Sequence, residues 1–126
     1  MSILGIGTDV LDEIRIVRLV ERGSDRFLRH WYTAAEIEQC RLSHRPGRTA
    51  ARGFAVKEAA LKAIGATFVG PVRWSDIEVL TDSHDVLRVR LDGEVEACAD
   101  RRGVRTLHAS TAHSTGWIAA VVVAEG

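Results

Sequence analysis

The chain has 126 residues, and its 17 basic and 17 acidic side chains give a formal net charge of zero. That balance argues against a protein whose main task is to coat nucleic acid. With 46% hydrophobic and 27% charged residues, the composition is that of an ordinary globular domain rather than a disordered or fibrous chain. The length suits a single domain over residues 1–126.

Several sequence features bear on location. No apolar run is long enough to span a membrane, and the first residues lack the basic segment that opens a signal peptide. Cys40 and Cys98 are far apart and form no C-x-x-C pair, so neither a zinc site nor a disulfide framework is indicated. We therefore expect a cytosolic protein that binds no membrane.

The first predicted element is a strand over residues 2–11. Alternation places Ile3, Gly5, Gly7 and Asp9 on one face of it. Glycine inside a strand marks a place where a ligand or another backbone approaches closely. We expect such an approach here, with Asp9 at the end of the glycine face.

A short helix is predicted next, from Glu13 to about Arg22. Arg15, Arg18 and Arg22 recur along it as an arginine stripe, which by itself is typical of a solvated helix face. Residues 27–31 continue in helical form, and a capping box of Thr33 and Glu36 opens a further helix to about Leu42. Residues 43–48, which include Pro-Gly, are expected to form a loop.

The central predicted helix, residues 50–64, is apolar nearly all round and yet carries Lys57, Glu58 and Lys62. A helix without a polar face is normally buried, and buried charge is costly unless a metal or counter-charge meets it. Glu58 and Lys62 are four residues apart and share one side of the helix. Two interpretations stay open, an ordinary ion pair between them or a bound ligand.

Gly65 ends this helix, and residues 66–71 are expected to form a flexible loop. Two hairpins follow, over residues 76–91 and 107–124, with a short helix at residues 94–102 between them. The last strand, residues 117–124, is apolar on both faces and is expected to be central and fully buried. The order of elements predicts an α+β fold, a mainly antiparallel sheet packed around the long central helix.

Asp9 and Glu58 are the candidate metal ligands. Mg²⁺ is often held by one or two carboxylates, with water and substrate phosphates as its other ligands. Lys57, Lys62 and His113 supply positive charge or protons for those phosphates, which implies a nucleotide-like ligand. Simpler interpretations remain, with Asp9 as a turn residue after a strand and His113 at a hairpin tip.

Two motifs, GIGTD at residues 5–9 and FAVKEAALKA at residues 54–63, resemble the two-part signature of the 4′-phosphopantetheinyl transferases. The chain length, Arg15-Ile16, the pair Thr33 and Glu36, DIEV at residues 76–79 and STAH at residues 110–113 are similar to the short, trimeric holo-[acyl-carrier-protein] synthase type. The resemblance covers nearly the whole chain, and the second motif is its specific part.

The resemblance implies transfer of 4′-phosphopantetheine from coenzyme A to a serine of an acyl carrier protein or carrier domain, which releases adenosine 3′,5′-bisphosphate. Asp9 and Glu58 would hold Mg²⁺ on the pyrophosphate, and Glu58 or a water on the metal would accept the serine proton. Lys62 would stabilise or protonate the departing phosphate. Arg52, Lys57, Lys62, Gly65 and His113 are the implied coenzyme A residues.

The same resemblance implies two kinds of macromolecular contact. Carrier proteins of this type are acidic, so Arg15, Arg18 and Arg22 become the candidates for docking the carrier. A homotrimer with coenzyme A sites between adjacent subunits is also implied, with the apolar final strand in the subunit contact.

The sequence departs from the family pattern at three places. The order Arg52-Gly53 displaces by one position the arginine that normally precedes Phe54, Ala66 and Thr67 follow Gly65 in place of Thr-Gly, and Ala112 replaces a serine. These changes motivate a second hypothesis, a catalytically weakened binding module for coenzyme A or a carrier protein. Retention of Asp9, Glu58 and Lys62 argues against it.

Overall fold

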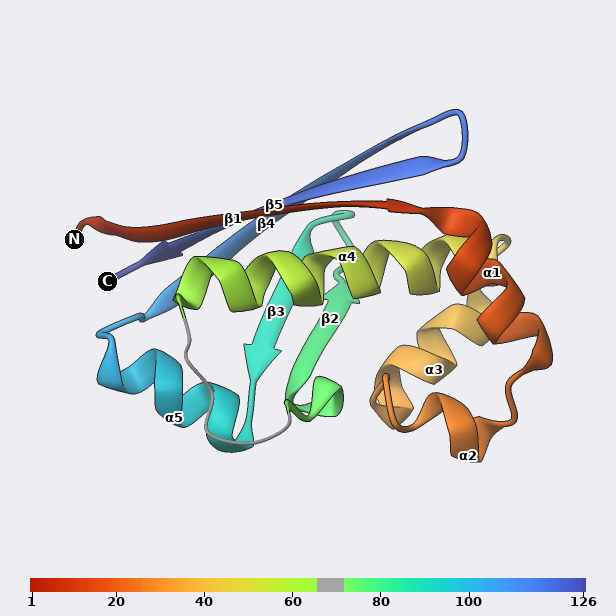
Figure 1. Ribbon diagram of the computed structural model, residues 1–126, viewed down its shortest axis with the longest axis horizontal. Helices are drawn as coiled ribbons and strands as arrows, with labels where there is room; N and C mark the ends of the chain where they lie inside the picture. The colour runs from red at the N-terminus through yellow and green to blue at the C-terminus, as the bar shows by residue number, and fades with distance from the viewer. Residues whose placement is uncertain (66–71) are drawn as a thin grey trace.

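The computed structural model describes residues 1–65 and 72–126, and the loop predicted for residues 66–71 lies outside the described residues. A three-stranded antiparallel sheet has the order β1-β5-β4, and a two-stranded sheet pairs β2 with β3. The long helix α4 lies between the two sheets, with α1, α2 and α3 grouped at one of its ends and α5 at the other (Figure 1). The predicted α+β architecture around a long central helix is confirmed.

The bounds of the elements agree with the predicted ones at most positions. In chain order they are β1 (Ile3–Asp12), α1 (Glu13–Arg22), α2 (Asp25–Leu28), α3 (Ala34–Leu42), α4 (Pro46–Ile64), the 3₁₀ helix η1 (Trp74–Asp76), β2 (Ile77–Thr81), β3 (Leu87–Leu91), α5 (Gly93–Arg101), β4 (Thr106–Ser114) and β5 (Trp117–Glu125).

The start of α4 differs from the prediction. The segment expected as a loop is already helical from Pro46, which occupies the first turn of the helix. Proline is tolerated there because its missing N–H has no intrahelical partner in any case. Gly47 then allows α1 to cross closely, since an added Cβ would lie 2.7 Å from a methyl group of Val17.

The glycine face of β1 is confirmed as a site of close backbone approach. A Cβ built on Gly5 would overlap the carbonyl oxygen of Ala63, and one built on Gly7 would overlap that of Ala59. The strand therefore lies almost directly on α4. This contact brings Asp9, near the end of β1, beside the middle of the helix.

The core surrounds α4 on both sides. Small buried side chains of the helix, such as Ala55, Ala59 and Ala63, pack with the inner faces of β5 and β2 and with α5. A second, smaller cluster joins the helices, where Tyr32 donates a hydrogen bond to the Ala50 carbonyl at 2.8 Å. None of the helices in the described ranges is long and apolar enough to cross a membrane.

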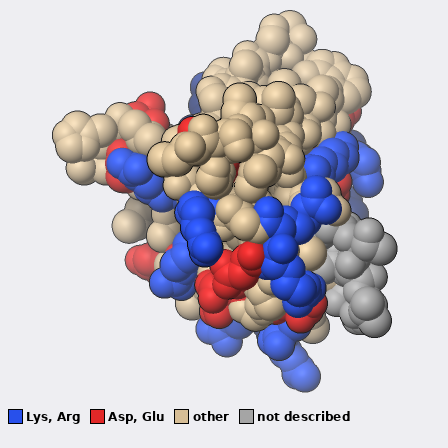
Figure 2. All heavy atoms as spheres, turned by 90° about the vertical axis from the view of Figure 1, so that its left-hand side faces the viewer, with Lys and Arg blue, Asp and Glu red and all other residues tan. Residues whose placement is uncertain are grey.

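The last strand was predicted to be buried on both faces, but only one of its faces is buried. β5 is central in its sheet, as expected, but its burial alternates, and Trp117, Ala119 and Val121 face outward. Ile6 and Val10 of β1, which are 60% and 63% exposed, extend the same outer face. An uncharged surface fills the upper part of Figure 2, the side on which Figure 1 shows this sheet. The single chain therefore leaves an apolar sheet face uncovered.

Candidate active site

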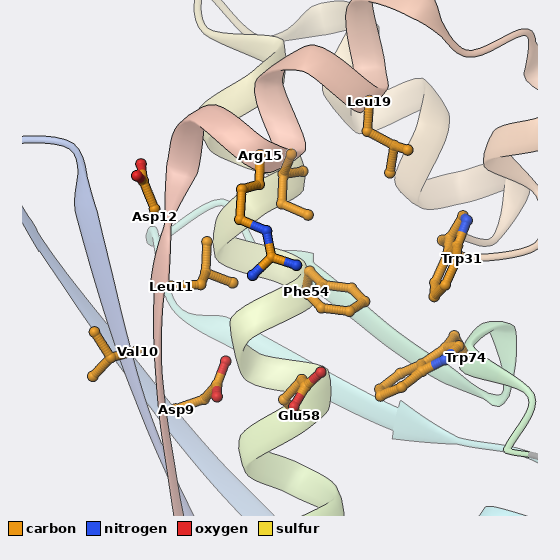
Figure 3. A pocket seen from close by; sticks show the side chains of 11 residues that line it. Asp9, Val10, Leu11, Asp12, Arg15, Leu19, Trp31, Phe54, Glu58 and Trp74 are labelled. Carbon is orange, nitrogen blue, oxygen red and sulfur yellow. The ribbon is translucent and has the colours of Figure 1, made fainter.

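A cavity of about 570 Å³ lies where β1 and α1 meet α4. Asp9 lies on the β1 side of it, Arg15 reaches in from α1, Phe54 and Glu58 project from successive turns of α4, and Trp31 and Trp74 lie beyond Phe54 (Figure 3). Asp9 comes from a strand and Glu58 from a helix, 49 positions later in the chain. The fold thus brings both carboxylates to one cavity.

The two carboxylates interact electrostatically. Partial burial raises the pKa of Glu58 above its ordinary value, and the negative charge of Asp9 raises it further, against the opposing effects of Lys62 and Arg15. Like charges held this close disfavour each other, and a cation between them relieves the cost. The carboxylates therefore form a place where positive charge is favoured.

Lys62 does not form the simple helical ion pair that its spacing allowed. Its ammonium donates to the Thr8 carbonyl at 2.9 Å and lies 3.6 Å from the Asp9 carboxylate. No ion pair within 4.0 Å joins it to Glu58 in residues 1–65 and 72–126. The Lys62 side chain is 56% exposed, so its ammonium remains accessible to a ligand beside Asp9.

Lys57 has a different place from the one predicted. Its side chain is fully buried, and its ammonium forms an ion pair with Glu36 at 2.7 Å. The same nitrogen donates to the Trp74 carbonyl at 3.0 Å and to the Ile77 carbonyl, which uses all three ammonium protons. No donor is left for a phosphate, so the assignment of Lys57 to coenzyme A is corrected to an internal ion pair.

Arg52 also points away from the cavity. It donates from Nη2 to the Thr81 hydroxyl at 3.0 Å and lines a separate hollow next to α3. Arg52 precedes Phe54 by two positions, about 200° around a helix, so the two side chains leave opposite sides of α4. Within the single chain, Arg52 is therefore not part of the Asp9–Glu58 site.

Gly65 and His113 lie away from the cavity as well. Gly65 ends α4 in the left-handed conformation (φ 65°), as the sequence predicted for a helix C-cap. His113 is an exposed residue inside β4 and not at the hairpin tip, because the turn is formed by Thr115 and Gly116, both with positive φ. A hydrogen bond from Arg48 is the main cause that lowers the pKa of Glu13, and His113 is close enough to make a smaller contribution, which places His113 near the start of α1.

The arginine stripe lines a second hollow that adjoins the first. Arg15, Arg18 and Arg22 share it with Leu19 and with Phe27, which is 41% exposed. Arg15 and Leu19 belong to both hollows. A partner that docks on this positive, partly apolar surface would lie directly beside Asp9 and Glu58.

Several residues of the site were not predicted. The aromatic side of the cavity shows three ring contacts, with centroids 5.9 Å apart for Trp31 and Phe54, 6.3 Å for Trp31 and Trp74, and 5.2 Å for Phe54 and Trp74. Only Phe54 stood in a motif. Trp31 and Trp74 come from separate segments, and no spacing in the sequence signals that they meet.

Fold and site together define a class of protein. The family model described as "4'-phosphopantetheinyl transferase superfamily" matches residues 5–122. The chain belongs to this superfamily.

Comparison with individual proteins shows which members of the superfamily the chain is similar to. The chain is 35% identical over 126 residues to a "Holo-[acyl-carrier-protein] synthase" of Serratia proteamaculans, with all of both chains covered. A crystal structure of holo-[acyl-carrier-protein] synthase from Neisseria meningitidis matches with a TM-score of 0.84 and 27% identity, over 99% of this chain and 100% of that one. The Helicobacter pylori synthase in complex with coenzyme A matches with a TM-score of 0.77 and 28% identity, over 95% and 99%.

Proposed function

We propose that this protein transfers the 4′-phosphopantetheine group of coenzyme A to a serine of an acidic acyl carrier protein or carrier domain. The observation that carries the proposal is the meeting of Asp9, Glu58 and Lys62 beside one cavity, in a chain of this superfamily. The similarity to a synthase solved with coenzyme A supports that cosubstrate.

The donor set at Asp9 and Glu58 fits Mg²⁺. In residues 1–65 and 72–126 no group of three or more His, Cys, Asp or Glu side chains is arranged to hold a metal ion. Two carboxylates are sufficient for Mg²⁺, which takes its other ligands from water and phosphate oxygens. Burial is the main cause of the raised pKa of Glu58 and the charge of Asp9 adds to it, and a cation between the two carboxylates would offset both costs. When bound, Mg²⁺ neutralises charge on the pyrophosphate of coenzyme A.

The residues of the site can then perform the transfer. The serine oxygen attacks the phosphorus that carries pantetheine, and the bond from that phosphorus to the bridging oxygen breaks, which releases adenosine 3′,5′-bisphosphate. Glu58, which faces the cavity, is the carboxylate proposed to accept the serine proton. Lys62, accessible and next to Asp9, stabilises negative charge on the departing phosphate.

The arginine stripe is the proposed docking surface for the carrier. Arg15, Arg18 and Arg22 present positive charge next to the cavity, and exposed Phe27 adds an apolar contact. Complementary charge of this kind steers an acidic partner and orients its serine.

The proposed assembly is a homotrimer in the cytoplasm, with sites between adjacent subunits. The uncovered apolar face of β1 and β5 supports a subunit contact, since large exposed apolar patches mark interaction surfaces. Arg52, Gly65 and His113, which lie away from the cavity within one protomer, can take part in coenzyme A binding if the neighbouring subunit completes the site.

The direct test incubates the protein with coenzyme A, Mg²⁺ and an apo carrier protein and measures the carrier's mass. We expect the phosphopantetheine increment with the native chain and none with Glu58→Gln, whose fold should be unchanged by circular dichroism. Coenzyme A binding without an increment on any of several fatty acid and polyketide carriers would favour the alternative function, a weakened binding module. The Gly53 and Ala112 departures motivate that alternative.

A further inference from the structure

The buried pair of Lys57 and Glu36 connects more elements than any other ion pair described. The Glu36 carboxylate accepts from Lys57 of α4, from the Thr33 N–H at 2.8 Å and from the Val79 N–H of β2 at 3.1 Å. The side chains of Lys57 and Glu36 are 0% and 4% exposed. One charge pair thus joins α4, the start of α3 and β2.

The carbonyls that Lys57 binds belong to the segment that carries one side of the cavity. Its ammonium donates to the carbonyl of Trp74, the first residue of η1, and to the carbonyl of Ile77, the first residue of β2. It also lies 5.3 Å from the centre of the Tyr32 ring, next to Trp31 in sequence. The aromatic wall is defined as Trp31, Phe54 and Trp74. The pair holds the backbone of Trp74 through Lys57, and the backbone two residues after Trp31 through the bond from the Thr33 N–H to Glu36.

Lys57 and Glu58 are neighbours on α4 and point in different directions, about 100° apart on a helix. Glu58 faces the cavity and Lys57 faces the core. The same turn of helix thus carries the Glu58 carboxylate and the anchor of the wall beside it.

Stability alone does not explain a buried pair of this kind. Removing two charges from water is costly, and apolar residues of the same volume often stabilise a protein equally well or better. A buried pair can instead select one arrangement of the elements that it joins, because each of its bonds has a required direction. Every buried side-chain nitrogen and oxygen in the described residues has a hydrogen-bond partner, as such a role requires.

We propose that Lys57 and Glu36 are positioning residues that set the place of the aromatic wall beside Glu58, and through it the fit of the coenzyme A arm in the cavity. This inference rests on the proposed function for the identity of the ligand. It assigns the pair an effect on substrate binding, while the chemistry is left to Asp9, Glu58 and Lys62.

The test uses the double variant Glu36→Gln/Lys57→Met, which removes both charges together and leaves no unpaired buried ion. We expect the KM for coenzyme A to rise at least tenfold, with kcat changed less than about threefold. Val95→Ala is the control, because Val95 is a buried core residue of α5 away from the cavity. It should lower thermal stability and leave KM unchanged.

A second measurement does not depend on activity. The chain has three tryptophans, and two of them, Trp31 and Trp74, belong to the aromatic wall. In a Trp117→Phe background, tryptophan fluorescence and its quenching by acrylamide report on that wall. The double variant should increase quenching in the native state, and Val95→Ala should not.

The outcomes separate the inference from the proposed function. If the native chain transfers no phosphopantetheine, the proposed function fails, while the fluorescence still decides whether the pair holds the wall. A folded double variant with unchanged quenching and unchanged KM overturns the inference, and so does a fall in kcat alone. If the double variant does not fold, Glu36→Asp, which keeps both charges but shortens the reach of the carboxylate to Lys57 and Val79, should show both effects in the same direction, and their absence there overturns the inference equally.

Discussion

The Lys62 ammonium lies 3.6 Å from the Asp9 carboxylate and bonds the Thr8 carbonyl, although Glu58 is one helical turn away on the same side of α4. Lys62 therefore bridges from the helix to β1. It is also the accessible one of the two lysines in the chain, since Lys57 is fully buried.

Replacing Lys62 by Met should reduce kcat by about 10²–10³, the usual effect of losing one group that stabilises transition-state charge. Binding of coenzyme A, measured by calorimetry, should change much less, because one exposed charge contributes little to a ground-state complex. Lys62→Arg keeps the charge and should retain more activity than Lys62→Met. Near-normal turnover of Lys62→Met would contradict a catalytic role.

The glycine face of β1 can be tested against another glycine of the same fold. Gly7→Ala should lower the free energy of unfolding by about 1–3 kcal/mol or more, because its Cβ would overlap a backbone carbonyl of α4. Gly53→Ala is the matched change inside α4, where the nearest atom to an added Cβ is 3.9 Å away. It should stabilise the protein by about 0.5–1 kcal/mol through helix propensity. Urea denaturation followed by circular dichroism measures both, and equal effects would refute the close-approach explanation.

Charge reversal on the arginine stripe tests carrier docking. Arg15→Glu/Arg18→Glu should raise the KM for an acidic carrier at least about tenfold at low salt, and the difference from the native chain should shrink as salt is added. The control is Arg105→Glu, which reverses one charge at an exposed position just before β4, away from α1. It should leave the KM for the carrier unchanged. An unchanged KM in the double variant would mean that the arginine stripe is a solvated helix face and does not dock the carrier.

The uncovered sheet face predicts the effect of a charge on assembly. Ile6→Asp should convert the proposed trimer into a monomer, because it would bury a carboxylate in an apolar contact. Leu42→Asp changes a side chain that is 79% exposed on α3 and should leave the mass unchanged. Light scattering after size exclusion measures both. A native chain that is monomeric at micromolar concentration would contradict the proposed trimer.

Asp82 gives the β2–β3 turn a predictable pH dependence. Hydrogen bonds from the Val86 and His84 N–H groups, and one from Arg88, lower the pKa of its carboxyl below the ordinary value. A lowered folded-state pKa means that this carboxylate stabilises the fold above its ordinary pKa of about 3.9 and loses that effect as pH falls. Asp82→Ala should therefore lower the Tm at pH 7, and its difference from the native chain should narrow below about pH 4. Asp100→Ala, at an exposed position of α5, provides the control.

Much of the architecture could be predicted because it depends on local rules. Alternation indicated β1 and the two hairpins, and the capping box of Thr33 and Glu36 marked the start of α3. The bare glycine face required a close neighbour, which proved to be the backbone of α4. Motif residues on a strand and a helix predicted that Asp9 and Glu58 act together, and both line one cavity.

Other features were decided by contacts between segments that are distant in the chain. The counter-charge of Lys57 is Glu36, because α3 and β2 pack where a ligand had been expected. Trp31 and Trp74 meet Phe54 only after three separate elements fold together. Burial of β5 depends on which elements cover each face of its sheet, and the hydrophobic periodicity of the sequence does not carry that information. The sequence by itself determined the elements and the charged groups of the site, since these follow from local pattern. Which charges face the cavity and which face the core was decided only by tertiary packing.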